Sequence, residues 1–165
     1  MFFHSMSSLN LEGYVDTNWA GFPNSQKSTT KWCMLIGSSL LSWKCKKQPR
    51  ISKSSMEAEY RSMSAGYSEI VWILRLMAEL HISVDGSTTL HAVSTTAIQK
   101  ATNPVHHKNT KHIEVDCHYI GELFVGQVIN LQHIMSHDQL ANLFTKAITR
   151  NRHQFSLSKL MLLDK

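Results

Sequence analysis

Three carboxylates in this sequence stand where they could bind a metal ion or act on a substrate: Asp16, Glu57 and Glu59. Asp16 interrupts an otherwise apolar and aromatic stretch of strand type, where an acidic residue most often faces solvent at a strand end. The two glutamates stand at the start of a long helical pattern. A strand carboxylate and a helix carboxylate that meet could hold a hard cation such as Mg²⁺, which takes oxygen ligands. Such pairs are common, so by themselves they name no reaction.

Helical spacing distinguishes the two glutamates. Glu59 lies three residues after Met56 and four before Met63, so it falls on the apolar stripe and is predicted to point toward a sheet. Glu57 lies four residues before Arg61 on the polar side, where an ion pair and a helix cap account for it, and we predict that it points to solvent. A lone buried carboxylate is costly unless a partner compensates it. An inward Glu59 therefore implies a cation, a cluster of donors or a metal.

The elements that must position these carboxylates follow from hydrophobic periodicity. Strands are predicted, the second and third of them as a hairpin, over residues 11–19, 30–36, 40–45, 88–93 and 128–134. Helices are predicted over residues 56–80, 94–101, 112–126 and 136–147. Capping boxes mark the first and last of these helices, with Ser54 and Glu57 in one and Ser136 and Gln139 in the other. This order predicts an α/β fold, a mixed five-stranded sheet flanked by helices, over residues 11–150 with an extension at 1–10 and a tail at 151–165.

Composition is that of one globular domain: 165 residues, 42% hydrophobic and 18% charged. No apolar run approaches the length of a membrane span, and the first residues lack the basic start of a secretory signal. Three widely spaced cysteines favour a reducing compartment over a disulfide framework, so we expect an intracellular protein of the cytoplasm or nucleus.

A formal charge of +5 is compatible with a polyanionic partner, although a solvated basic surface explains it equally well. The basic residues gather in a predicted connection between the hairpin and the long helix, and the candidates for contact with a nucleic-acid backbone are Lys44, Lys46, Lys47 and Arg50. The four tryptophans fall in predicted strands and the long helix, where core packing is expected to outweigh base stacking.

Six blocks of the sequence occur in an order that identifies a family. They read GYVDTNWAG at 13–21, STT at 28–30, LSWKCKKQP at 41–49, SSMEAEYR at 54–61, NPVH and TKHIEVD between 103 and 116, and HDQLANLFTK at 137–146. Together they resemble the ribonuclease H domain of Ty1/copia-type retrotransposon Pol polyproteins. The resemblance covers most of the chain and none of the preceding polymerase domain, so we expect a fragment or a truncated copy of a longer polyprotein.

The resemblance implies a ribonuclease H-like fold that cuts the RNA strand of RNA–DNA hybrids during reverse transcription. It also implies four acids that hold two Mg²⁺ ions, one to activate water and one to stabilise the leaving oxygen. Carried over by position, the first acid is Asp16 and the second Glu59, whereas the third position holds Val93 and the fourth Asn142. Valine offers a metal no oxygen and asparagine offers a neutral one, so the resemblance predicts a catalytically impaired copy.

Three alternatives remain open from the sequence: an active hybrid-specific ribonuclease with unusual partners, a non-catalytic remnant that keeps the fold, and a domesticated nucleic-acid-binding or interaction module. The expected partners are an RNA–DNA hybrid and the reverse transcriptase domain of the parent polyprotein. In a revertant series, Val93→Asp is predicted to restore more cleavage than Asn142→Asp.

Overall fold

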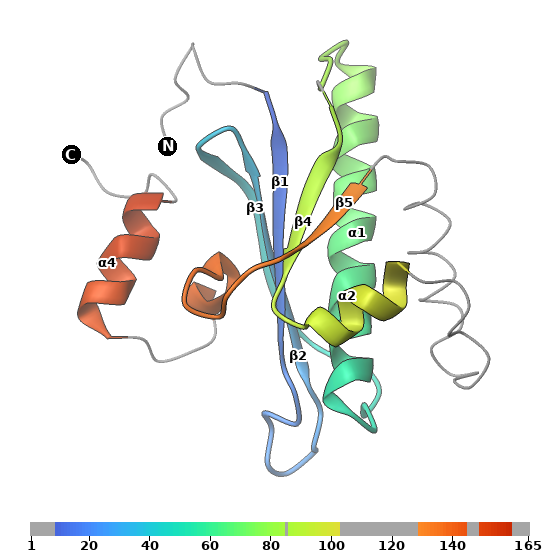
Figure 1. The fold of residues 1–165 in the computed structure, drawn as a ribbon, viewed down its shortest axis with the longest axis vertical. Coiled ribbons are helices and arrows are strands. Elements are labelled where there is room, and N and C mark those ends of the chain that lie inside the picture. Colours follow the sequence, from blue (N-terminus) through green and yellow to red (C-terminus); the bar gives the residue numbers. More distant parts are fainter. Residues whose placement is uncertain (1–8, 85, 103–128, 145–148, 160–165) are drawn as a thin grey trace.

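A computed structural model of the chain describes residues 9–84, 86–102, 129–144 and 149–159. Its central feature is a five-stranded sheet in the order β3-β2-β1-β4-β5 (Figure 1). The strands are β1 (Leu11–Asn18), β2 (Thr29–Ile36), β3 (Ser39–Lys47), β4 (Thr88–Ala92) and β5 (Ile129–His133). The pairs β1–β2 and β2–β3 are antiparallel, while β1–β4 and β4–β5 are parallel. The predicted α/β class, the hairpin and the mixed five-stranded sheet are confirmed.

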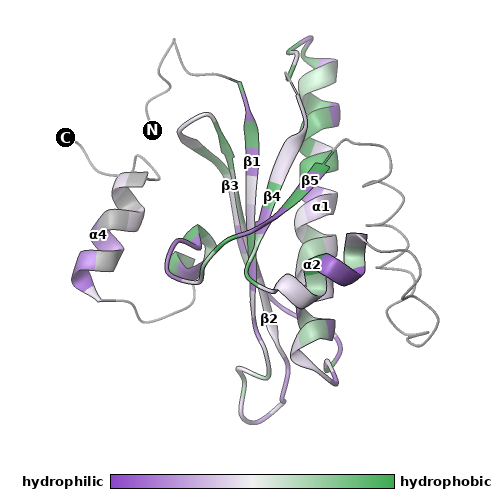
Figure 2. Cartoon of the chain, viewed as in Figure 1, coloured by the Kyte–Doolittle hydropathy of each residue, from purple (hydrophilic) through white to green (hydrophobic). Residues whose placement is uncertain are grey.

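One face of the sheet is covered by α1 (Ser55–Glu79), with α2 (Thr95–Thr102) beside it. The α1 helix begins where the sequence predicts, because the Ser54 side chain accepts a hydrogen bond from the Glu57 amide at 3.1 Å. Its apolar stripe meets the sheet in the main core, whose members include Val15, Met34, Met63, Ile70 and Leu90. Figure 2 shows this hydrophobic character along the strands and α1.

The opposite face carries a smaller core and η2 (Leu140–Phe144), a short 3-10 helix. Four buried residues form this second core: Cys33, Leu35, Leu40 and Leu140. The helix α4 (Arg150–Lys159), which falls in the stretch predicted as a tail, contacts η2. Among the described residues, no helix has the length and apolar character needed to cross a membrane.

The predicted helix over 136–147 is wrong for the residues that the structure describes. Residues 136–138 form a turn, and regular structure resumes only in η2. The physical reason lies in Gln139, whose Nε2 donates to the Val15 carbonyl oxygen at 2.9 Å and whose Oε1 accepts from the Ala141 amide at 3.1 Å. An amide used in this way cannot reach back to cap a helix at Ser136. The predicted helix over 112–126 lies outside the described residues.

The tryptophans also differ from prediction. Only Trp32 is buried in the core, whereas Trp19, Trp43 and Trp72 are about half exposed, at 48%, 58% and 58%. Trp43 lies on β3, an edge strand, and Trp72 lies on the outer side of α1. Edge strands and outer helix faces leave one side of each residue unpacked, which local periodicity does not reveal.

Candidate active site and basic cavity

Three of the four predicted site positions lie at the same end of the sheet. Asp16 is near the carboxyl end of β1, which runs parallel to β4. Because Val15 pairs with Ala92, the next positions along the two strands are Asp16 and Val93. The carboxyl ends of adjacent parallel strands are where α/β proteins commonly place functional groups. Asn142 reaches this end from η2, a segment that packs on β1 and β2.

A lysine that the sequence analysis did not single out joins two of these residues. Lys31 on β2 is the cross-strand partner of Asp16, and its Nζ lies 2.8 Å from Asp16 Oδ2. The same Nζ donates to Asn142 Oδ1 at 2.9 Å. Lys31 has no exposed surface, and Asp16 and Asn142 are 4% and 3% exposed. One sequence signal could have revealed it: Lys31 is the only charged residue of β2, a strand that is otherwise apolar or uncharged.

The orientation of Asn142 is fixed from its other side. Its Nδ2 donates to the Ser136 carbonyl oxygen at 3.0 Å, so Oδ1 is the atom left to accept from Lys31. Two buried charges of opposite sign are tolerated in a protein interior only when they pair closely and satisfy further hydrogen bonds. Lys31, Asp16 and Asn142 meet that condition, and we call them the lysine triad.

The fourth predicted residue, Glu59, lies in the second turn of α1 and is partly buried. One turn further on, the Ser62 hydroxyl donates to the Asp16 carbonyl oxygen at 3.2 Å, which holds this part of α1 against β1. This contact places the first turns of α1 beside the backbone of Asp16, on the face of the sheet opposite η2.

The prediction that Glu57 points to solvent is wrong, because this residue is only 6% exposed. Its Oε1 lies 2.6 Å from Arg61 Nη2, as the spacing predicted, and its Oε2 accepts from the Lys53 amide at 2.8 Å. These two donors compensate its burial. Burial of the two glutamates is therefore opposite to the prediction, since Glu57 is buried and Glu59 is only partly buried.

The lysine triad bears directly on whether Mg²⁺ fits here. Magnesium requires a nearly octahedral set of oxygens at about 2.0–2.1 Å. The Asp16 and Asn142 oxygens already contact the Lys31 ammonium, and Val93 has no side-chain oxygen. In the part of the chain that the structure describes, no group of three or more His, Cys, Asp or Glu side chains could hold a metal ion. These residues do not fit the two Mg²⁺ ions that the resemblance implies.

Further ionisable side chains lie on the strands near Asp16. Tyr14 and His91 are register partners, and their rings stack with centroids 4.6 Å apart. Burial lowers the pKa of His91, an effect that the nearby Glu12 carboxylate partly opposes. Burial also raises the pKa of the Cys33 thiol on β2 to about 12, so this thiol stays protonated and unreactive at neutral pH.

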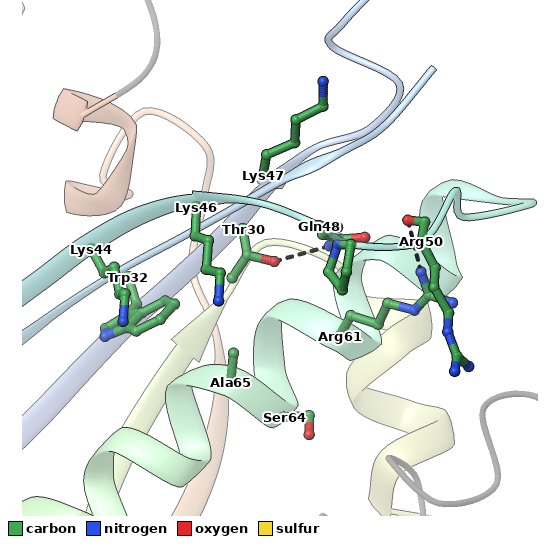
Figure 3. Close-up of a pocket in the computed structure, with 11 residues that line it drawn as sticks. Thr30, Trp32, Lys44, Lys46, Lys47, Gln48, Arg50, Arg61, Ser64 and Ala65 are labelled. Atoms are coloured by element: carbon green, nitrogen blue, oxygen red, sulfur yellow. Dashed lines mark hydrogen bonds between the residues drawn. The ribbon is translucent and has the colours of Figure 1, made fainter. Parts of the chain in front are cut away.

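The predicted basic residues line a cavity of about 420 Å³ between β3 and α1 (Figure 3). Cations on its wall come from three segments: Lys44, Lys46 and Lys47 from β3, Arg50 from the connection, and Arg61 from α1. Lys44 lies in the strand predicted over 40–45, whereas the prediction that Lys46 and Lys47 lie in a connection is wrong, because β3 extends to Lys47. Lysines are common on edge strands, where their charge blocks pairing with another sheet.

Several contacts order the wall of this cavity. Lys44 Nζ lies 5.5 Å from the centre of the Trp32 ring, and Arg61 donates to the Arg50 carbonyl oxygen at 3.1 Å. Gln48 donates to the Thr30 hydroxyl at 2.9 Å. In Figure 3, Lys44 and Lys46 extend from β3 toward α1, while Lys47 points away from them. The cavity lies on the α1 face of the sheet, opposite the face on which Lys31 meets Asn142 of η2.

Comparison with solved structures defines the class of protein. The chain superposes on LC11-RNase H1 in complex with an RNA/DNA hybrid with a TM-score of 0.59 and 12% identity, covering 79% of this chain and 88% of that one. It superposes on the N-terminal RNase H domain of rv2228c from Mycobacterium tuberculosis with a TM-score of 0.57 and 13% identity, covering 92% and 98% of the two chains. A third match is to the prototype foamy virus protease-reverse transcriptase, with a TM-score of 0.53 and 11% identity over 98% of this chain and 21% of that one. The fold is that of a ribonuclease H-like domain.

Sequence relatives then specify the family. The chain is 34% identical over 160 residues, 97% of its length, to the retrovirus-related Pol polyprotein from transposon RE1 of Arabidopsis thaliana. It is 35% identical over 150 residues to that from transposon RE2 of the same plant, and 29% identical over 144 residues to that from transposon TNT 1-94 of Nicotiana tabacum. It spans 10–11% of the length of these relatives. No family model matches the sequence. The chain is thus a ribonuclease H-like domain homologous to a segment of copia-type retrotransposon Pol polyproteins.

Proposed function

We propose that this domain binds RNA–DNA hybrids through the basic cavity and cleaves them little or not at all. The observation that carries the binding proposal is the set of cations from β3, the connection and α1 that surround one cavity on a ribonuclease H fold. Duplexes of A-like form are recognised through their shape and phosphates. Cations on separate elements, held by contacts such as that of Lys44 with Trp32, suit successive phosphates of one backbone.

The weak-cleavage proposal is supported by the chemistry of the residues at the Asp16 end of the sheet. Hybrid hydrolysis with two metals needs several oxygen ligands of high negative charge. Here Val93 supplies no oxygen, Asn142 supplies a neutral one, and the Asp16 carboxylate is paired with Lys31. Asp16 and Glu59 stand at the first two acidic positions of the family, but the four metal ligands that the family resemblance implies are incomplete.

The neighbouring partner in this proposal is the reverse transcriptase domain of a longer polyprotein. Its support is the alignment of nearly the whole chain with about a fifth of the foamy virus protease-reverse transcriptase. In that setting the domain would hold a hybrid next to the polymerase without removing its RNA strand.

A salt titration of hybrid binding tests the first half of the proposal. The logarithm of the affinity should fall linearly with the logarithm of the salt concentration, because binding releases counterions from the phosphates. Arg50→Glu should weaken binding by roughly tenfold and make the slope shallower by about one to two. Its matched control is Arg75→Glu, which makes the same charge change on an exposed part of α1 outside the cavity wall. Equal losses in both variants, or an affinity that ignores salt, would refute the assignment of the cavity.

A cleavage assay on the same hybrid, with Mg²⁺ or Mn²⁺, tests the second half. We expect product formation near background. Robust metal-dependent cleavage that disappears in Asp16→Asn would instead establish an active ribonuclease and overturn this part of the proposal.

A further inference from the structure

We propose that Lys31 is a built-in cation that replaces the divalent metal at the Asp16 end of the sheet. The Lys31 ammonium lies between oxygens from two other elements, Asp16 Oδ2 on β1 at 2.8 Å and Asn142 Oδ1 on η2 at 2.9 Å. These are two of the four positions at which the family resemblance places metal-binding residues. The inference rests on the proposed function only in identifying where a metal would be needed.

The geometry suits an ammonium group and opposes a divalent ion. The 2.8 Å separation is that of a close ion pair and the 2.9 Å contact is a charge-assisted hydrogen bond, whereas Mg²⁺ requires its oxygens at about 2.0–2.1 Å. An ion bound to the same Asp16 oxygen would lie within about 5 Å of the Lys31 nitrogen, where two positive centres repel strongly in a site of low polarity.

Lys31 cannot easily withdraw to make room. Its strand, β2, is hydrogen-bonded to β1 on one side and β3 on the other, and the residue has no exposed surface. A surface lysine could swing into water when a metal approaches. Here the side chain is enclosed under η2, and the amide of Asn142 is held in place by the Ser136 carbonyl oxygen. The ammonium is therefore a fixed part of the site.

The charge balance leads to the same conclusion. Of the four positions implied by the resemblance, only Asp16 and Glu59 are acidic, a formal charge of −2, and counting Lys31 reduces this formal sum to −1. A lysine at this position offsets the charge of Asp16 whatever the metal concentration. Because the Lys31 ammonium remains, we expect that a carboxylate added at position 93 or 142 will not by itself create a metal site.

Binding of Mn²⁺ to the full chain, measured by calorimetry and by the Mn²⁺ paramagnetic resonance signal, tests this inference without any nucleic acid. The unmodified chain should show no saturable site. Lys31→Ala removes the ammonium and opens space beside Asp16, so it should show a saturable Mn²⁺ site at least about tenfold tighter than the weakest affinity that the calorimeter detects. It should also gain thermal stability in Mn²⁺ relative to EDTA. Lys100→Ala, which removes a lysine on α2 away from the triad, is the charge-matched control and should bind no more Mn²⁺ than the unmodified chain.

A second variant keeps the test decisive if Lys31→Ala fails to fold. Lys31→Gln retains most of the side-chain volume and removes the charge, and the same gain in Mn²⁺ binding is expected. Val93→Asp with Lys31 intact should show no gain. Saturable Mn²⁺ binding by the unmodified chain that is lost in Asp16→Asn would overturn the inference, and so would a gain in Val93→Asp or the absence of a gain in both Lys31 variants. The Mn²⁺ experiments contain no nucleic acid, whereas the proposed function is tested by hybrid binding and hybrid cleavage. Failure of this inference is therefore distinguishable from failure of the proposed function.

Discussion

Lys31 and Asp16 face each other across the antiparallel pair of β1 and β2, with almost no access to water. Removing one partner of a buried ion pair typically costs about 3–5 kcal/mol, because the other charge is left uncompensated. Asn142 adds a neutral oxygen to the same ammonium. The contact that compensates the buried charge of Asp16 therefore also occupies the oxygens that a metal ion would need as ligands.

This arrangement changes the expected result of the revertant series. The sequence alone predicts that Val93→Asp restores more hybrid cleavage than Asn142→Asp. With Lys31 in place, we expect both single revertants and the double revertant to stay near background. Asn142→Asp places a second carboxylate beside the ammonium, but it also removes the amide that donates to the Ser136 carbonyl oxygen.

Only the triple variant, with Lys31→Ala added to both revertants, is expected to show metal-dependent cleavage. The measurement is the initial rate on one hybrid for every combination, because residues that share one site do not act additively. Strong cleavage by the double revertant with Lys31 intact would contradict this expectation.

At the scale of elements, the position of α1 depends on a close approach to β1. A Cβ added at Gly66 would collide with the Val15 side chain, which is fully buried. Alanine would otherwise favour a helix by about 1 kcal/mol over glycine. We expect the collision to dominate, so that Gly66→Ala destabilises the domain by about 1–3 kcal/mol in denaturant unfolding.

The control for this expectation is the double variant Gly66→Ala/Val15→Ala. It should lose less than the sum of the two single variants, because the smaller residue on β1 makes room for the new methyl group. Additive losses would show that the contact between α1 and β1 is not the cause.

The burial of His91 on β4 leads us to expect that the free energy of unfolding depends on pH. Burial lowers the pKa of His91 below its value in the unfolded chain, so the unfolded state binds more protons between those two values. The contribution of neutral His91 is complete above the unfolded pKa of about 6.5 and is lost as the pH falls toward the folded pKa. We expect His91→Gln to flatten the acid side of a plot of unfolding free energy against pH. An acid slope that is the same in His91→Gln as in the unmodified chain would contradict this expectation.

At the scale of the whole molecule, the basic cavity and the lysine triad lie on opposite faces of the sheet. The basic cavity lies on the α1 face, and the lysine triad lies on the η2 face with β2 supplying residues to both. Neighbours along β2 alternate between faces, so Trp32 reaches the cavity while Lys31 reaches Asp16.

This separation predicts independent effects. In the double variant Lys31→Gln/Arg50→Glu, the change in Mn²⁺ affinity should match that of Lys31→Gln alone. The change in hybrid affinity without metal should likewise be within about 0.5 kcal/mol of the sum of the single changes. The two binding measurements on all four proteins check this, and a large coupling energy would mean that the regions are linked through β2.

Sequence alone determined the elements whose signals are local. Periodicity and capping over short stretches predict the strands, the hairpin, the N-cap of α1 at Ser54 and the apolar stripe of α1. The structure has the bounds of these elements within a residue or two of the prediction. The family resemblance likewise depends on motifs read along the chain. These features are encoded by neighbours in sequence, so they can be predicted without knowing the fold.

Only the tertiary structure decided which polar groups meet. Lys31 and Asn142 are 111 residues apart, and Gln139 and the Val15 carbonyl are 124 apart. No local pattern encodes such contacts, which is why the helix over 136–147 was predicted wrongly and why the lone charge of Lys31 in β2 does not by itself identify the partners of Lys31. Burial of Glu57 has the same origin, since its cost depends on the donors that the fold brings to it. The free energy of a buried polar group is set by its partners in space, and those partners exist only once the chain has folded.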